Sequence, residues 1–175
     1  MSSVDEERPY LVLGSDTVIQ EVLIKSFLRG MLDRFRRKDA DVEYQIFRIS
    51  RTGEIYAEDF VFYRSNYSSV RKMKASIDPG TAAFIINRIV LILSKSSGPV
   101  TDVTAPMWEV HLQDTNGKPH PCCGLMFTDP SYEGASLSKY IRDTLSWCLE
   151  EQYLDVFHPG ELILFDGGDR SIKDL

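Results

Sequence analysis

Apolar residues recur along this chain at two spacings, one typical of helices and one typical of strands. The helical spacing is clearest over residues 17–38, where apolar side chains follow one another at intervals of three and four positions. The apolar positions of this stretch are Ile24, Phe27, Leu28, Met31, Leu32 and Phe35. Lys25, Arg29 and Arg36 fall on the opposite side. We therefore expect an amphipathic helix over 17–38 that turns a basic side to solvent.

A first β-hairpin is predicted over residues 42–63. The stretches 42–49 and 55–63 are rich in β-branched and aromatic residues, which favour strands. The residues between them include Thr52 and Gly53, which suit a turn. The chain is therefore expected to fold back on itself here as two antiparallel strands.

A second β-hairpin is indicated more strongly. Apolar and polar residues alternate over 108–113 and lead to Asn116-Gly117, the preferred pair for a two-residue type I′ turn. The return strand contains Pro119 and Pro121. Because proline cannot donate a backbone hydrogen bond to a neighbouring strand, we expect this strand at an edge of the sheet.

Three further elements complete the predicted order. Asp78-Pro79 is typical of a helix start, and the apolar residues over 82–93 are so frequent that this segment is either a deeply buried helix or a strand. Another amphipathic helix is predicted from about Ser136. The short apolar run Leu162–Phe165 is predicted as a last strand.

These elements give the order α-β-β-α-β-β-α-β, which predicts an α+β fold. We expect a single domain over residues 1–175, with a mostly antiparallel sheet and the helices packed on one of its faces. Residues 1–10 and 167–175 are expected to form flexible tails. The other face of the sheet is then left for water or for a partner.

Composition places the chain among ordinary globular proteins. It has 175 residues, of which 43% are hydrophobic and 26% charged. It lacks the roughly 18 consecutive apolar residues of a membrane span, and its acidic start lacks the pattern of a signal peptide. Its three cysteines are an odd number, with Cys122 and Cys123 adjacent, which makes a poor disulfide framework. We therefore expect a soluble cytoplasmic protein in a reducing compartment.

Charge is distributed unevenly along the chain. The net charge of the whole chain is −6, but residues 25–95 carry +6, while residues 1–24 carry −4 and residues 96–175 carry −8. Two basic clusters, over 25–38 and 64–74, produce the positive middle. Such segregation suggests binding surfaces. The candidate residues for a partner or a polyanion are Lys25, Arg29, Arg36, Arg37, Lys38, Arg71, Lys72 and Lys74.

The common catalytic sequence patterns are missing from this chain. It contains no G-x-S-x-G, no phosphate-binding G-x-x-x-x-G-K-[ST], no G-x-G-x-x-G and no H-E-x-x-H. We therefore expect neither an enzyme nor a cofactor, and we infer no small-molecule substrate.

One cluster of metal-ligand types stands out in the second hairpin. A two-residue turn at Asn116-Gly117 would set His111 opposite Cys122. His120, two residues nearer the turn than Cys122, would lie on the same face. Histidine and cysteine are ligands that zinc prefers. The cluster lacks the spacing of known zinc motifs and has no evident fourth ligand.

Three hypotheses for function follow from the sequence. The first is a non-catalytic module for protein interaction or self-assembly, accessory or regulatory in role, whose partner is another protein or a second copy of the chain. The second is an adaptor that binds an anionic membrane surface or nucleic acid through the basic 25–38 and 64–74 segments. The third is a metal- or thiol-dependent protein that uses His111, His120 and Cys122.

Overall fold

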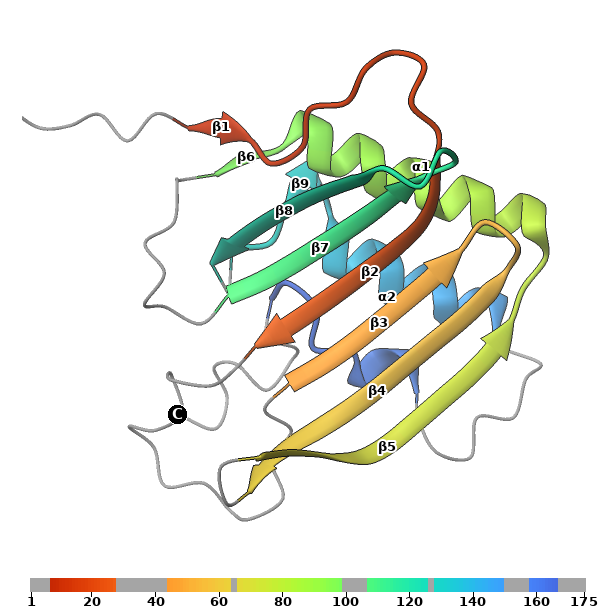
Figure 1. Cartoon of the computed structure of the whole chain (residues 1–175), viewed down its shortest axis with the longest axis vertical. Coiled ribbons are helices and arrows are strands. Elements are labelled where there is room, and N and C mark those ends of the chain that lie inside the picture. Colours follow the sequence, from red (N-terminus) through yellow and green to blue (C-terminus); the bar gives the residue numbers. More distant parts are fainter. Residues whose placement is uncertain are drawn as a thin grey trace, which may run out of the picture.

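The computed structural model describes residues 7–27, 44–63, 66–98, 107–125, 128–149 and 158–166. Six strands form one sheet in the order β5-β4-β3-β2-β7-β8 (Figure 1), and each neighbouring pair is antiparallel. The strands are β2 Ile19–Phe27, β3 Tyr44–Ser50, β4 Glu54–Tyr63, β5 Asn66–Ser76, β7 Met107–Asp114 and β8 Pro119–Leu125. The fold is thus α+β with a mostly antiparallel sheet.

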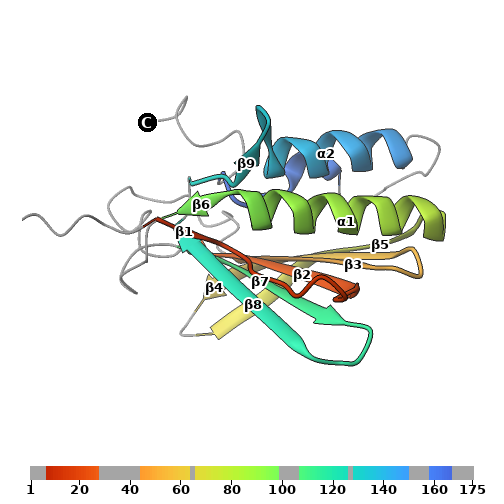
Figure 2. The ribbon, with the colours of Figure 1, turned by 90° about the horizontal axis from the view of Figure 1, so that it is seen from above.

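Two helices, α1 Pro79–Lys95 and α2 Leu137–Cys148, lie on the same side of this sheet (Figure 2). α1 begins as predicted, because the Asp78 carboxylate accepts the backbone N–H of Thr81 at 3.1 Å. α2 begins after Ser136, whose hydroxyl accepts the N–H of Lys139 at 3.4 Å. The segment 82–93, which the sequence left open, is therefore helical.

The apolar core lies between the helices and the sheet. α1 contributes Ile85, Ile86, Ile89 and Ile92, all fully buried. Trp108 of β7 is fully buried as well and meets Phe165 edge to face, with ring centroids 4.9 Å apart. Among the described residues, no helix is long and apolar enough to cross a membrane.

Short strands pin both the start of the chain and the entry to α2. β1 Arg8–Pro9 pairs with β6 Ser97–Gly98, and β9 Ser131–Tyr132 pairs with β10 Ala135–Ser136. The Tyr10 N–H also donates to the carbonyl of Ser96 at 3.1 Å. Residues 8–10, which the sequence assigned to a flexible tail, are therefore held against the end of α1.

The prediction of a helix over 17–38 is wrong for residues 19–27. These residues form β2, a central strand that pairs with β3 on one side and β7 on the other. Their apolar residues suit a strand that is apolar on both faces as well as they suit a helix, so spacing alone chose the wrong element. Residues 28–38 of the predicted helix lie outside the described residues.

Two other predictions for the chain are corrected. β5 was not predicted at all, yet it is the longest strand, with 11 residues. The run Leu162–Phe165 is buried but is not a strand, since it follows a short 3-10 helix at Pro159–Glu161 and turns at Leu164, where φ is 39°. The first hairpin is confirmed as β3 and β4, and the second as β7 and β8.

The C-terminal turn is attached to the sheet and to α2 by side chains. The Ile163 N–H donates to Gln45 Oε1 at 2.6 Å, and the Ser26 hydroxyl donates to the Leu164 carbonyl at 2.8 Å. The Phe165 N–H donates to Ser138 Oγ at 3.2 Å. These bonds satisfy the buried backbone groups of a segment that has no strand partner.

Candidate functional site

One side of the six-stranded sheet faces away from α1 and α2, and we call it the outer sheet face. No helix or strand of the described ranges lies over it (Figure 1, Figure 2). Because side chains alternate along a strand, the buried positions identify the neighbours that point outward. The outward residues of β2, β3, β4 and β5 include Leu23, Lys25, Phe27, Tyr44, Ile46, Arg48, Tyr56, Glu58, Phe60, Tyr67, Ser69, Lys72 and Lys74.

Four aromatic residues cross this face from β2 to β5, and we call them the aromatic row: Phe27, Tyr44, Phe60 and Tyr67. Phe27 stacks on Tyr44 with centroids 4.7 Å apart. Tyr44 is also 5.1 Å from Phe60 and 5.4 Å from Tyr67. Burial against these rings is the main reason that the pKa of the Tyr44 hydroxyl rises to about 12. The row is a rigid apolar strip at the outer surface.

Further apolar side chains occupy outward positions of the central strands. Leu23 and Ile46 are half-buried there, although the opposite positions of the same strands, Ile24 and Phe47, already fill the core. A sheet with one face in water normally places polar residues outward. The central strands therefore have apolar side chains on both faces.

Polar groups surround the apolar positions and are bonded to one another. Glu58 accepts a hydrogen bond from the Tyr56 hydroxyl and lies 3.5 Å from Lys72 Nζ. Burial acts to raise the pKa of Glu58, but hydrogen bonds from Ser69 and Tyr56 and the charge of Lys72 outweigh it and lower that pKa. The Arg48 guanidinium lies 5.6 Å above the Tyr56 ring, within cation–π range.

On the β7 side of the face, polar groups also lie close to one another. Glu109 Oε2 lies 3.0 Å from His111 Nε2, and Glu109 is paired with Lys25 of β2 in the sheet register. Among the described residues, the outward cations of the sheet are Lys25, Arg48, Lys72 and Lys74, and the outward carboxylates are Glu21, Glu54, Glu58 and Glu109. Over the described residues, the four cations and four carboxylates of the outer sheet face balance.

The predicted basic residues that the structure describes do not form one patch. Lys25 lies on β2, whereas Lys72 and Lys74 lie on β5, about 14 Å away across two intervening strands. Arg71 points to the opposite side of the sheet. Arg29, Arg36, Arg37 and Lys38 lie outside the described residues.

Arg71 is a structural residue. Its Nε donates to Asp59 Oδ2 at 2.8 Å and its Nη1 donates to Glu161 Oε2 at 2.8 Å. Asp59 is fully buried, and Gln45 Nε2 donates to its other oxygen at 2.5 Å. Burial acts to lower the pKa of Arg71, but the bonds to Asp59 and Glu161 raise it. This cation is committed to the fold.

The proposed metal cluster does not form, because the second hairpin has a different register. Asp114 Oδ1 accepts the N–H groups of Asn116 and Lys118 at 2.9 Å each, and Asp114 pairs with Lys118 across a three-residue loop. Gly117 closes that loop with φ of 81°, where glycine is favoured. One extra loop residue exchanges the two faces of the return strand.

His111 is consequently opposite Pro121, and it points outward. His120 and Cys122 point to the helix side, where His120 bonds to Asp114 at 2.9 Å and burial raises the pKa of Cys122 to about 12. Cys123 is exposed. Within the described ranges, no group of three or more His, Cys, Asp or Glu residues could hold a metal ion.

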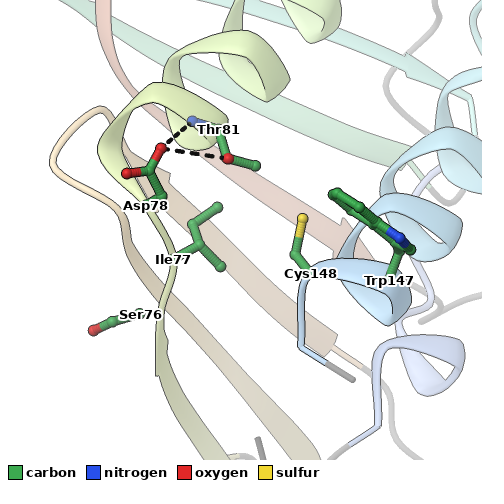
Figure 3. Close-up of a pocket in the computed structure, with 6 residues that line it drawn as sticks. All are labelled: Ser76, Ile77, Asp78, Thr81, Trp147 and Cys148. Atoms are coloured by element: carbon green, nitrogen blue, oxygen red, sulfur yellow. Dashed lines mark hydrogen bonds between the residues drawn. The ribbon is translucent and has the colours of Figure 1, made fainter. Parts of the chain in front are cut away.

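A shallow hollow of about 360 Å³ lies between the start of α1 and the end of α2 (Figure 3). Its lining is Ser76, Ile77, Asp78, Thr81, Trp147 and Cys148. Asp78 is occupied by its hydrogen bond to the Thr81 N–H, and burial raises the pKa of the Cys148 thiol. A thiol with a raised pKa is a poor nucleophile, so the hollow does not resemble a catalytic site.

Comparison with known proteins gave no match to a family model, to a curated protein or to a solved structure.

Sequence reasoning missed the aromatic row. Tyr67 and Phe60 were visible as aromatics in the region of the predicted hairpin, but Phe27 was assigned to a helix and could not be placed beside Tyr44. The consecutive apolar residues Val22-Leu23-Ile24 were a usable signal, because such a run is typical of a strand covered on both faces.

Proposed function

We propose that this protein is a non-catalytic interaction module, accessory or regulatory in role, and that the outer sheet face is its docking surface. The observation that carries the proposal is the presence of apolar side chains at outward positions of the central strands, namely Leu23, Ile46 and the aromatic row. Contiguous apolar surface rimmed by polar residues is typical of protein interfaces.

The charge of the face favours a protein partner over a polyanion. A surface that binds membranes or nucleic acid gathers cations with few anions among them. Here Glu58 lies beside Lys72, and Glu109 lies opposite Lys25 in the register. Aromatic side chains together with paired charges match the composition of protein–protein interfaces.

Site-specific photo-crosslinking tests this proposal. Benzoylphenylalanine in place of Tyr67 or Lys74 puts the probe at an exposed position of the outer sheet face. The matched control replaces Trp147, an aromatic residue of α2 that is 73% exposed. We expect discrete protein adducts from positions 67 and 74 in cells that make the protein, and none of the same mass from position 147.

Absence of adducts from both outer positions would reject the outer sheet face as a docking surface. Adducts from the position 147 probe alone would move the interface to the helix layer and reject it as well.

A further inference from the structure

We infer that the occupant of the outer sheet face is a second copy of this chain, so that two sheets pack face to face as a β-sandwich. The inference rests on the proposed function and names the partner. It is carried by the size of the face, by its charge balance and by the position of the aromatic row.

The size of the face matches that of a stable dimer interface. Six strands separated by about 4.8 Å span roughly 24 Å, and strands of 7 to 11 residues extend roughly 24–37 Å. The face therefore offers roughly 600–900 Å² per copy, close to the roughly 800 Å² per partner of a stable interface. Its extent is sufficient without any contribution from the helix layer.

The charges of the face permit it to meet its own copy. Each chain has a net charge of −6, so a dimer interface must avoid adding repulsion between the two copies. The described residues of the outer sheet face carry four cations and four carboxylates, and Glu58 lies 3.5 Å from Lys72 within the chain. A second copy therefore adds no net charge to the contact. A strongly acidic or basic partner would instead require a face of one sign.

A two-fold axis gives this contact a specific geometry. An axis parallel to the strands and between β2 and β3 sets Tyr44 of one copy over Phe27 of the other, and it sets Phe60 and Tyr67 over β7 and β8 of the second chain. The same axis sets Glu58 over Glu109, so the neighbouring cations Lys72 and Lys25 must offset the repulsion between the two carboxylates. Stacked sheets pack about 10 Å apart with their strands within about 30° of each other, which suits interleaved rings.

Light scattering over about 1–100 µM protein tests the inference. We expect a species of twice the chain mass at the upper end. Ile46→Glu places a charge at the centre of the contact, and Arg48→Glu changes an exposed residue beside it. Each variant should raise the dimer dissociation constant at least tenfold. The control Phe84→Glu alters a residue of α1 that is 67% exposed in the helix layer, and it should leave the dimer unchanged.

Circular dichroism and urea unfolding separate loss of the dimer from loss of the fold. If Ile46→Glu does not fold, Arg48→Glu decides alone, because its side chain is exposed. A wild-type protein that is monomeric at about 100 µM overturns the inference. A dimer that neither variant weakens also overturns it.

The crosslinking probes distinguish this failure from failure of the proposed function. An adduct of twice the chain mass from position 67 or 74 supports the second copy. An adduct of those positions with a different protein, from a chain that is monomeric in solution, overturns the second copy and leaves the docking surface intact. No adduct from either position overturns both.

Discussion

At the residue scale, Asp59 shows how one buried carboxylate joins separate parts of the chain. It belongs to β4, and it receives hydrogen bonds from Gln45 of β3 and from Arg71 of β5. Gln45 in turn accepts the N–H of Ile163, and Arg71 extends to Glu161. The network thus fixes the C-terminal turn to three neighbouring strands.

Replacing Arg71 with methionine should be strongly destabilising. Arg71→Met keeps much of the side-chain volume but leaves the carboxylate of fully buried Asp59 without its counter-charge. Removal of one partner from a buried pair leaves an uncompensated charge, so we expect the free energy of unfolding to fall by about 3 kcal/mol. Urea denaturation measures the change.

The matched control is Lys72→Met, one residue along the same strand. The Lys72 side chain is 61% exposed and its pair with Glu58 is at the surface, so its loss should cost less than about 1 kcal/mol. Equal unfolding midpoints for the two variants would contradict a structural role for Arg71.

At the element scale, the pieces that the sequence predicted are those with strong local signals. α1 begins at the Asp78-Pro79 pair that marked its start, and α2 begins at Ser136. Each signal is a hydrogen-bonding or backbone preference that acts within a few residues. Such preferences survive whatever the rest of the chain does.

β2 and the aromatic row could not be predicted in this way, because both depend on neighbours that are distant in the sequence. Leu23 and Phe27 point outward while Val22 and Ile24 point into the core, so β2 has no apolar-polar alternation. The missing alternation made the strand hard to predict. It also places apolar side chains on the outer side of β2, where we propose the docking surface.

β5 and the run Leu162–Phe165 show two different limits of predicting elements from apolar patterns. β5 is an edge strand whose residues 66–70 are all exposed, so its sequence carries little apolar pattern. Leu162–Phe165 is fully apolar and buried, but its backbone is bonded to side chains such as Gln45 and Ser26. An apolar run therefore predicted burial correctly and the element incorrectly.

Gly124 of β8 provides a test of element packing. A Cβ atom at this position would lie 2.3 Å from Cζ2 of Trp108, which is fully buried between Tyr10 and Phe165. Gly124→Ala should therefore force the indole to shift and should lower the free energy of unfolding by about 1–3 kcal/mol. Thermal or urea unfolding measures it.

Gly160→Ala serves as the control, because a Cβ atom there would meet nothing within 4 Å. This variant should keep wild-type stability or gain slightly from a more restricted unfolded chain. If Gly124→Ala were equally stable, the close packing of β8 on Trp108 would be disproved.

At the scale of the whole molecule, the helices and the sheet form two layers with one exposed side of unusual composition. α1 and α2 both cover the same face, and the core between the layers includes Trp108 and Phe165 (Figure 2). The opposite face carries apolar side chains such as Leu23, Ile46 and Phe27 among its polar residues, and no described element covers it. Association is the means by which that surface would leave water.

Salt provides a test at this scale. Because burial of apolar side chains such as Ile46 and Phe27 is what favours the proposed contact, the dimer should persist at both about 50 mM and about 500 mM salt, conditions between which the Debye length shortens severalfold. Light scattering on a size-exclusion column measures the mass. Dissociation at high salt would show that charge, and not the aromatic row, holds the copies together.

The prolines of β8 oppose the addition of further strands at that edge of the sheet. Pro119 and Pro121 lie on the outermost strand at one end of the sheet, where they cannot donate hydrogen bonds to an added strand. At the other end, β5 has an irregular register between Asp59 and Phe60 of its partner strand and carries Lys72 and Lys74. Edge-to-edge pairing, which would propagate into fibres, is thus discouraged at both ends. Face-to-face pairing ends at two copies, so the fold favours a closed and soluble assembly.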